Sequence, residues 1–176
     1  MYSHFQNISP TLLKKAKDVK ILITDCDGVL TDNGVYYTEK GEAMKRFSIR
    51  DGMGVERLRN LVEVDTAIMT GETSGSVAKR GEKLKLNHVF LGIKNKKEYL
   101  LQWMKESGLE SQHIAYIGDD TNDIDVMSIV GITATPADST PFTAIKADYI
   151  CKEKGGYGAF REFAEFIIFA KLFDPL

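Results

Sequence analysis

The segment Ile21-Leu-Ile-Thr-Asp-Cys-Asp-Gly-Val-Leu-Thr-Asp32 joins a short apolar run to a loop that holds two carboxylates and a glycine. Four consecutive apolar or β-branched residues, 21–24, fit a strand that is buried on both faces, as in a parallel sheet. Carboxylates at positions i and i+2 of the following loop can share one hard cation, while the loop amides hold an anion beside it. We therefore predict a strand over 21–24, with Asp25 and Asp27 as candidate ligands at its end.

Two other interpretations apply to this loop. A polar strand end followed by ordinary turn residues would leave a similar pattern. A calcium loop of the EF-hand type does not fit, because Val29 and Thr31 would fill its fifth and seventh positions and Tyr36 stands where Glu is required. The choice between a binding site and a simple turn therefore depends on the rest of the chain.

Short apolar runs of the same kind recur along the chain, at 67–69, 89–91, 114–117 and 132–134. Between them lie stretches with helical spacing of apolar residues, at 55–61, 74–85, 96–105 and 123–130. Alternating strands and helices are typical of an α/β fold with a doubly wound parallel sheet, which binds ligands at the carboxyl ends of its strands. We expect residues 1–176 to form one domain of this class, because that length suits a single core.

Two segments depart from the alternation. Gly34-Val-Tyr-Tyr37 and Ala43-Met-Lys-Arg-Phe-Ser48 flank Thr38-Glu-Lys-Gly41, which predicts a projecting β-hairpin flap over about 33–48. Near the C-terminus, Gly155-Gly-Tyr-Gly158 precedes a stretch with helical spacing that starts at Ala159. The glycine-rich segment and its helix together cover about 155–170.

The composition excludes several classes of protein. Lys and Arg number 23 against 25 Asp and Glu, so the chain lacks the basic surface that nucleic acid requires. It also lacks an apolar run of about 20 residues that would cross a membrane, and its start does not follow the signal-peptide pattern. We expect a soluble cytoplasmic protein in which Cys26 and Cys151, both in apolar strand-like contexts, are buried reduced thiols.

A second acidic motif, Gly118-Asp-Asp-Thr-Asn-Asp123, follows the apolar run 114–117. Equivalent strand ends converge in a doubly wound sheet, so Asp119 can reach the same cation as Asp25 and Asp27. Asp120 and Asp123 are better placed to orient ligands or to cap the next helix. Taken alone, the motif is more often a turn with a helix cap.

Two more strand ends offer groups that suit a phosphate. Thr70-Gly71 follows 67–69 and supplies a hydroxyl and a flexible backbone, while Lys96 opens the stretch 96–105 and can neutralise nearby negative charge. Each has an ordinary alternative, a strand terminus for Thr70 and a solvated lysine for Lys96. A carboxylate pair, a hydroxyl, a lysine and a third carboxylate, each at its own strand end, favour a phosphate-handling site over chance.

The order Asp25-x-Asp27-Gly-Val-x-Thr, Thr70-Gly71, Lys96 and Gly118-Asp-Asp120 resembles the four motifs of the haloacid dehalogenase superfamily of phosphotransferases. Lys45-x-Phe-Ser-Ile-Arg-Asp-Gly52, the hairpin before it, and Gly155-Gly-x-Gly-Ala-x-Arg-Glu162 are similar to its 3-deoxy-D-manno-octulosonate 8-phosphate phosphatase branch. The resemblance runs from about Lys20 to Ala170.

The resemblance implies a phosphatase mechanism. Asp25 is the expected nucleophile and forms an aspartyl-phosphate, and Asp27 is the expected acid and base. Asp25, the Asp27 carbonyl and Asp119 are the expected ligands of Mg²⁺, with Thr70 and Lys96 stabilising the transferred phosphoryl group. Oxygen ligands for a hard cation agree with the absence of a His or Cys cluster from the sequence.

The chain is too short to carry a separate cap over this site, because 33–69 has only 37 residues and the 47 residues of 72–118 are already filled by two helices and a strand. Such an enzyme would act on large substrates or borrow its lid from a neighbouring subunit. The resemblance implies a homotetramer in which hairpins form a central barrel and the glycine-rich C-terminal segment reaches a neighbour's active site. An apolar hairpin with Val35, Tyr36, Tyr37 and Phe47 agrees with a buried contact between subunits, and a hairpin covered by a helix of its own chain is the ordinary alternative.

The expected substrate is a small phosphorylated 2-keto-3-deoxy sugar acid. Arg50 and Arg80 can pair with its carboxylate, although Arg80 can equally belong to a solvated face of 74–85. Eight-carbon enzymes of the branch usually carry Arg after Thr70-Gly71, whereas Glu72 with Lys83 looks more like the phosphatases of nine-carbon sialic-type acid 9-phosphates. Glu72 would repel a substrate carboxylate, but it can accept hydrogen bonds from a polyol or pair with Lys83. The candidate substrate-binding residues are Asp27, Ser48, Ile49, Arg50, Asp51, Gly52, Thr70, Gly71, Glu72, Arg80, Lys83 and Lys96.

The sequence therefore predicts a Mg²⁺-dependent sugar acid phosphatase with an eight-carbon or a nine-carbon substrate. The alternative is a catalytically idle scaffold or regulatory subunit of a sugar-acid activation pathway. Intact Asp25, Asp27, Lys96 and Asp119 argue against that alternative.

Overall fold

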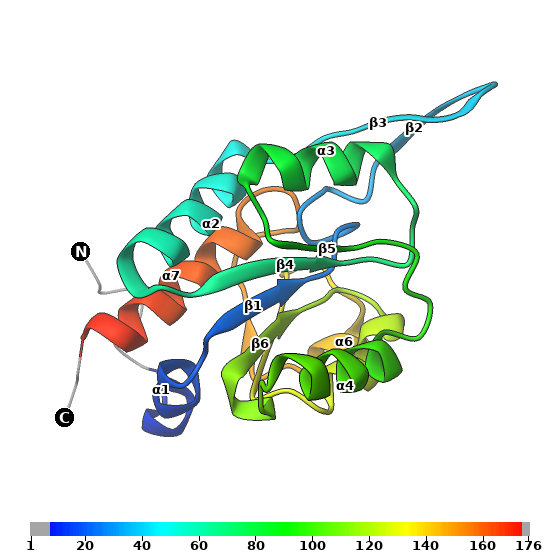
Figure 1. Ribbon diagram of the computed structural model, residues 1–176. Coiled ribbons are helices and arrows are strands. Elements are labelled where there is room, and N and C mark those ends of the chain that lie inside the picture. The colour runs from blue at the N-terminus through cyan, green and yellow to red at the C-terminus, as the bar shows by residue number, and fades with distance from the viewer. Residues whose placement is uncertain (1–7, 174–176) are drawn as a thin grey trace.

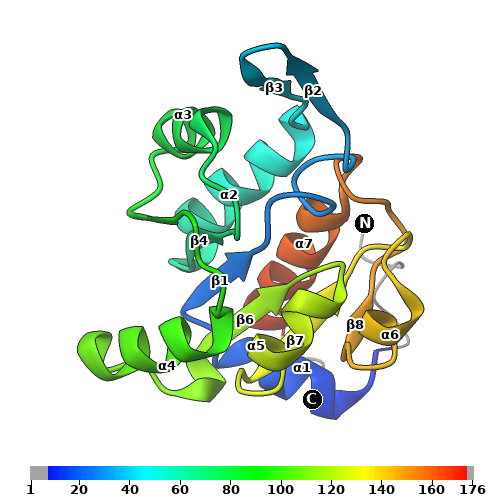
Figure 2. The same cartoon turned by 90° about the vertical axis from the view of Figure 1, so that its right-hand side faces the viewer.

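The computed structural model describes residues 8–173. Six parallel strands form one sheet in the order β5-β4-β1-β6-β7-β8 (Figures 1 and 2). Their bounds are Ile21–Thr24 (β1), Asp65–Met69 (β4), His88–Phe90 (β5), Ile114–Ile117 (β6), Ile132–Thr135 (β7) and Tyr149–Ile150 (β8). The doubly wound α/β class that the sequence predicts is confirmed.

Helices cover both faces of the sheet. Their bounds are Pro10–Lys17 (α1), Ile49–Val62 (α2), Gly75–Leu84 (α3), Lys96–Ser107 (α4), Ile124–Met127 (α5), Pro141–Ala144 (α6) and Ala159–Leu172 (α7), with 3₁₀ turns at Ser111–His113 (η2) and Thr121–Asp123 (η3). One core cluster joins Leu22 to α1, α2, α3 and α7, and the other joins Ile21 and Ile23 to α4 and α5. Successive residues of β1 thus face opposite layers, which is why a central parallel strand is apolar throughout.

A β-hairpin stands apart from this sandwich. Strands β2 (Val35–Thr38) and β3 (Gly41–Lys45) pair with each other and project beyond the carboxyl end of β1 (Figures 1 and 2). The second strand ends before Ser48, because the Ser48 side chain caps α2 by accepting a hydrogen bond from the backbone of Asp51. The hairpin is therefore a little shorter than the expected 33–48.

The cysteines and the helix lengths bear on three further expectations. Both cysteines are free and buried. Among the described residues, the helices are all too short or too polar to cross a bilayer. The expected helix over 123–130 is shorter in the structure, because η3 takes its first turn and α5 ends at Met127.

Candidate active site

The carboxyl ends of three neighbouring strands meet at one place. Thr24 of β1 lies level with Ile68 of β4 and with Ile117 of β6, so the residues that follow them emerge side by side. The Asp25 amide still donates to the Ile117 carbonyl at 2.9 Å, which holds the start of the loop against β6. The sheet register thus brings Asp25, Thr70 and Asp119 together from three distant parts of the sequence.

Lys96 lies beside Asp25 in a buried ion pair. Its Nζ is 2.9 Å from Asp25 Oδ1 and 2.6 Å from Asp123 Oδ1. Asn95 caps α4 by accepting from the Glu98 amide, so Lys96 occupies the first position of that helix. Burial on its own lowers the pKa of Lys96, but the charges of Asp25 and Asp123 outweigh it and raise that pKa.

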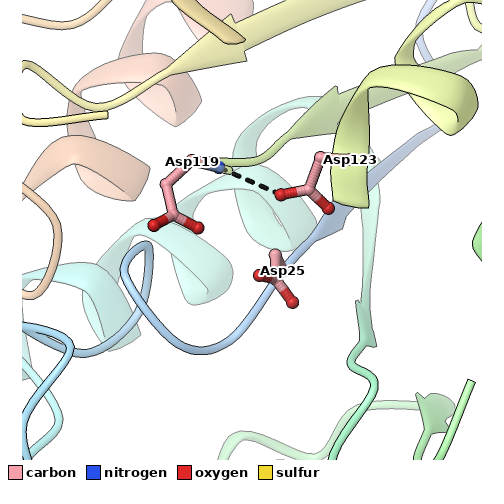
Figure 3. A group of neighbouring side chains, drawn as sticks. All are labelled: Asp25, Asp119 and Asp123. Carbon is pink, nitrogen blue, oxygen red and sulfur yellow. Dashed lines mark hydrogen bonds between the residues drawn. The ribbon is translucent and has the colours of Figure 1, made fainter. Parts of the chain in front are cut away.

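The carboxylates of Asp25, Asp119 and Asp123 surround a common space (Figure 3). One oxygen from each lies within 4.8 Å of the others. Asp123 Oδ2 accepts from the amides of Asp119 and Asp120, at 3.1 and 3.4 Å, and Oδ1 accepts from Tyr116 Oη and from Lys96. Both oxygens of Asp123 are therefore engaged by protein donors, which leaves Asp25 and Asp119 to face the space.

The electrostatics of this cluster suit a divalent cation. Burial, followed by the nearby Asp123 carboxylate, raises the pKa of Asp25 to about 7 and that of Asp119 to about 7. One buried lysine does not balance three buried carboxylates, and carboxylate oxygens are the donors that Mg²⁺ prefers. The donor set therefore fits a hard metal ion between Asp25 and Asp119.

A small cavity of about 200 Å³ opens above the acidic cluster. Its lining consists of Asp25, Asp27, Asn33, Thr70, Gly71, Glu72, Asp119, Asp120 and Asn122. Thr70 is buried and its Oγ1 accepts from the Glu72 amide at 3.2 Å, which shapes the turn after β4. The sequence-predicted residues of all three strand ends are thus gathered in one cavity.

Two asparagines in this lining were not predicted. Asn33 donates through Nδ2 to Asp119 Oδ2 at 3.4 Å, and its backbone is left-handed, with φ of 62°. Asn is one of the few non-glycine residues that adopts this conformation readily, which is a weak signal in the sequence. Asn122 lies in η3 beside Asp119 and carries no such signal.

Asp27 lies at the edge of the cavity and contacts the hairpin. Lys45 of β3 approaches both of its oxygens, at 2.7 and 2.6 Å, and Thr31 Oγ1 donates to Oδ1 at 3.4 Å. Gly28, with φ of +83°, turns the chain directly after Asp27. Lys45 begins one of the motifs quoted above, but the sequence predicted no role for it.

The expected substrate residues of the hairpin end lie elsewhere. Ser48 caps α2, Ile49 is exposed, and buried Asp51 accepts from the Arg161 amide at 2.9 Å. Arg80 donates to the Ser48 carbonyl at 2.7 Å, and Arg50 lines a separate hollow with Tyr157 and Arg161. Within residues 8–173, the stretch 48–52 and Arg80 are therefore outside the cavity that holds Asp25.

Glu72 also differs from expectation in its partner. The sequence suggested a pairing with Lys83, but in the structure the Glu72 Oε1 lies 3.6 Å from Lys94 Nζ. Lys94 precedes α4, whereas Lys83 is an exposed residue near the end of α3. The correction follows from the turn after β5, which returns the chain to β4: the Gly92 amide donates to the Glu72 carbonyl and the Ile93 amide to the Thr70 carbonyl.

The glycine-rich segment packs against the loop after β1, residues 25–34, of its own chain. The Gly156 amide donates to the Val29 carbonyl at 2.9 Å, and a Cβ on Gly155 would lie 1.8 Å from the Gly28 carbonyl oxygen. This close approach of two backbones explains the glycines. It places Gly155 beside Gly28, and Gly156 beside Thr31, of the same chain. The reach to a neighbour's active site that the resemblance implies stays a prediction.

Comparison with known proteins agrees with this geometry. Residues 82–159 match the family of haloacid dehalogenase-like hydrolases. The chain is 34% identical to 3-deoxy-D-manno-octulosonate 8-phosphate phosphatase of Escherichia coli K12 over 93% of this chain and 87% of that protein. The Haemophilus influenzae phosphatase of the same name is 34% identical over 90% of this chain and 87% of that protein.

Solved structures of phosphatases with the same name also superpose on this chain over most of its length. The phosphatase from Moraxella catarrhalis, in complex with magnesium ion, phosphate ion and KDO, superposes with a TM-score of 0.86 at 34% identity, covering 91% of each chain. The one from Yersinia pestis gives a TM-score of 0.88 at 33% identity, over 93% of this chain and 88% of that one. With strand ends, acidic cluster and sequence all in agreement, the chain belongs to the haloacid dehalogenase superfamily of hydrolases, in the branch of the 3-deoxy-D-manno-octulosonate 8-phosphate phosphatases.

Proposed function

We propose that this protein is a Mg²⁺-dependent phosphatase that hydrolyses the phosphate monoester of a 2-keto-3-deoxy sugar acid through an aspartyl-phosphate. The observation that carries the proposal is the buried Asp25, paired with Lys96 and facing Asp119 at the floor of a cavity that Asp27 and Thr70 also line. A cavity of this size accommodates a phosphoryl group and leaves the sugar in its mouth.

In the first half of the reaction, a carboxylate oxygen of Asp25 attacks phosphorus and the bond from phosphorus to the sugar oxygen breaks. Asp27 donates a proton to the departing sugar oxygen. Lys96 holds Asp25 in place through its 2.9 Å contact, and the Thr70 hydroxyl offers a hydrogen bond to a phosphoryl oxygen.

In the second half, Asp27 takes a proton from a water molecule, which attacks phosphorus on the side opposite Asp25. The bond from phosphorus to Asp25 then breaks, inorganic phosphate leaves, and both carboxyl groups return to their starting states. Asp123 acts on the geometry of both steps by orienting Lys96 and the amides after β6.

The residues that would hold Mg²⁺ are Asp25, Asp119 and the carbonyl of Asp27. When bound, the ion stabilises negative charge on the phosphoryl oxygens. Asn33 supports this arrangement, because its hydrogen bond to Asp119 Oδ2 leaves Asp119 Oδ1 free of that contact. Asp120 is a positioning residue at the start of η3, where its side chain accepts from the Thr121 amide.

The names of the relatives support the eight-carbon substrate, 3-deoxy-D-manno-octulosonate 8-phosphate. Glu72 in the lining of the cavity supports a nine-carbon sialic-type 9-phosphate instead, because a carboxylate repels a substrate carboxylate and accepts hydrogen bonds from a longer polyol. Glu72→Arg should shift the preference toward the eight-carbon acid. An unchanged ratio of kcat/KM for the two substrates would remove the case for nine carbons.

The decisive experiment measures phosphate release from both substrates, with Mg²⁺ and with EDTA. Wild type should be active only with the metal, and Asp25→Asn should lose about 10⁴-fold or more, because no other group replaces the nucleophile. Asp125→Asn, the same change on an exposed residue of α5, is the matched control. Equal release by Asp25→Asn would refute the nucleophile, and inactive wild type would favour the idle scaffold.

A further inference from the structure

Lys45 is a buried lysine whose nearest partner is the expected acid and base. Its side chain is 1% exposed, and its Nζ lies 2.7 Å from Asp27 Oδ1 and 2.6 Å from Asp27 Oδ2. An ammonium group taken out of water is costly unless it is paired and hydrogen-bonded. In this fold the contact with Asp27 supplies that pairing, with Nζ lying across the two oxygens of the Asp27 carboxyl group.

A second contact holds Lys45 from the other side. Glu42, three residues earlier on β3, places Oε2 3.6 Å from Lys45 Nζ and accepts a hydrogen bond at Oε1 from Ser74 Oγ at 2.5 Å. Ser74 caps α3, directly after the turn that carries Thr70 and Glu72. Strand β3 thus connects the loop after β1, which lines the cavity, to the N-cap of α3, which lies two residues beyond Glu72 in that lining.

The position of Asp27 needs such support. Proton transfer requires the donor within about 2.6–3.2 Å of the accepting oxygen, and Asp27 sits on a loop that turns sharply at Gly28. In the part of the chain that the structure describes, its other side-chain contact is Thr31 Oγ1 at 3.4 Å, which is long for a hydrogen bond. Lys45 supplies the two short contacts that fix the rotation of the carboxyl group.

We propose that Lys45 is a positioning residue for catalysis: it holds the Asp27 carboxyl group at the edge of the cavity, and Glu42 holds Lys45. This inference rests on the proposed function, in which Asp27 transfers the proton to the leaving sugar oxygen. It gives the hairpin a chemical task in addition to any contact between subunits.

The test compares two leaving groups in single turnovers of Lys45→Met. A sugar alkoxide needs a proton when it leaves, whereas p-nitrophenolate leaves without one. The variant should release the sugar from octulosonate 8-phosphate about 100-fold more slowly than wild type, but p-nitrophenol from p-nitrophenyl phosphate less than about 10-fold more slowly. Lys45→Arg should restore part of the loss, and Glu42→Gln should give an intermediate loss of the same pattern.

Lys40→Met, at the exposed tip of the same hairpin, is the matched control and should match wild type with both substrates. A merely structural role for Lys45 would slow both leaving groups alike. Equal losses with both substrates, or no loss with the sugar phosphate, would overturn the proposal.

A second measurement separates this proposal from the proposed function. Wild type that is inactive with both substrates would refute the phosphatase, and hydrogen exchange then decides on Lys45. Backbone amides of 26–33 should exchange about 10-fold faster in Lys45→Met than in Lys40→Met, because the loop loses its tie to the hairpin. Unchanged exchange would overturn the positioning role.

Discussion

At the scale of single residues, the acidic cluster makes the metal-free protein sensitive to pH. Asp25 and Asp119 have pKa values raised from the ordinary 3.8 to about 7, first by burial and then by Asp123. Between about pH 4 and pH 7, these two groups are therefore protonated in the folded protein but ionised in the unfolded chain. Stability linked to these groups is complete below about pH 4 and is lost as pH rises through about 7.

We expect the free energy of unfolding in EDTA to fall from pH 5 to pH 8 by an amount on the order of 5 kcal/mol, and Mg²⁺ to remove much of that fall. Urea denaturation at several pH values measures it. Asp119→Asn should flatten the dependence, because it removes one of the two titrating groups. The pKa values of Glu42 and Glu165 are lowered from 4.5, so these groups change stability only below the range from pH 5 to pH 8. A chelated wild type that gains stability toward pH 8 would contradict the prediction.

Gly28 tests whether the site has room for a side chain next to Asp119. A Cβ there would lie 2.0 Å from Asp119 Oδ2, and its φ of +83° disfavours any L side chain. Gly28→Ala should cost about 3 kcal/mol or more of stability and weaken Mg²⁺ binding at least about 10-fold, measured by titration calorimetry. Gly41→Ala is the control, because it has φ of +103° but nothing within 4 Å. Gly41→Ala should lower stability without changing Mg²⁺ affinity. Equal Mg²⁺ affinities in the two variants would refute the explanation that a Cβ at position 28 collides with Asp119.

The sequence could predict that three site residues lie close together, namely Asp25, Lys96 and Asp119. Each comes after an apolar run, and a parallel sheet aligns the ends of such runs. The contact of Lys45 with Asp27 could not, because it depends on how the hairpin folds back over the loop. Lys83 was one of two options for a partner of Glu72, the other being a polyol, and the structure places Lys94 there for a similar reason. No periodic rule links residues on different elements, and the turn after β5 decides that Lys94 comes near.

At the scale of elements, the strands over 21–24 and 114–117 were predicted to the residue, because both are buried on both faces. Three elements, α1, α6 and β8, were not predicted from the sequence. The helix α6 and the strand β8 are too short to show a period, at four and two residues. The helix α1 does carry a start signal, Ser9 at the N-cap followed by Pro10, and that signal was overlooked.

The glycine-rich segment packs on the loop after β1, residues 25–34, and this contact leads to a prediction. Gly155→Ala would place Cβ 1.8 Å from a backbone oxygen of Gly28, which cannot move aside as a flexible side chain would. We expect a loss of about 3 kcal/mol or more and a lower kcat, because Gly28 adjoins Asp27 and touches Asp119. Thermal unfolding and turnover measure the two effects.

Gly75→Ala is the matched control for that variant. Gly75 begins α3, and a Cβ added there would meet nothing within 4 Å, so alanine should be neutral or stabilise by about 0.4–1 kcal/mol. Should Gly155→Ala be as stable and active as Gly75→Ala, the close approach of the two backbones would not matter for the site.

At the scale of the whole molecule, the cavity lacks a cap domain among residues 8–173, while the hairpin projects beyond the carboxyl end of β1 (Figure 2). Tyr36, Tyr37 and Met44 of the hairpin are 59%, 72% and 58% exposed. Within residues 8–173, these three side chains are therefore not covered by a helix of the same chain. A cluster of exposed apolar residues on a projecting hairpin favours a contact with further copies of the chain, as the expected homotetramer requires.

Tyr37→Glu tests that expectation, because a carboxylate in an apolar contact between subunits is costly to bury. We expect the mass measured by light scattering to fall from that of the wild-type assembly toward that of a single chain. Turnover of the sugar phosphate should fall with it, because β3 also carries Lys45 to Asp27 and a displaced hairpin loosens that contact.

Phe142→Glu, at a residue of α6 that is 70% exposed, is the matched control and should leave mass and turnover unchanged. A Tyr37→Glu protein with wild-type mass would show that the hairpin is not the contact, and a smaller assembly with wild-type turnover would show that the active site is complete within one chain.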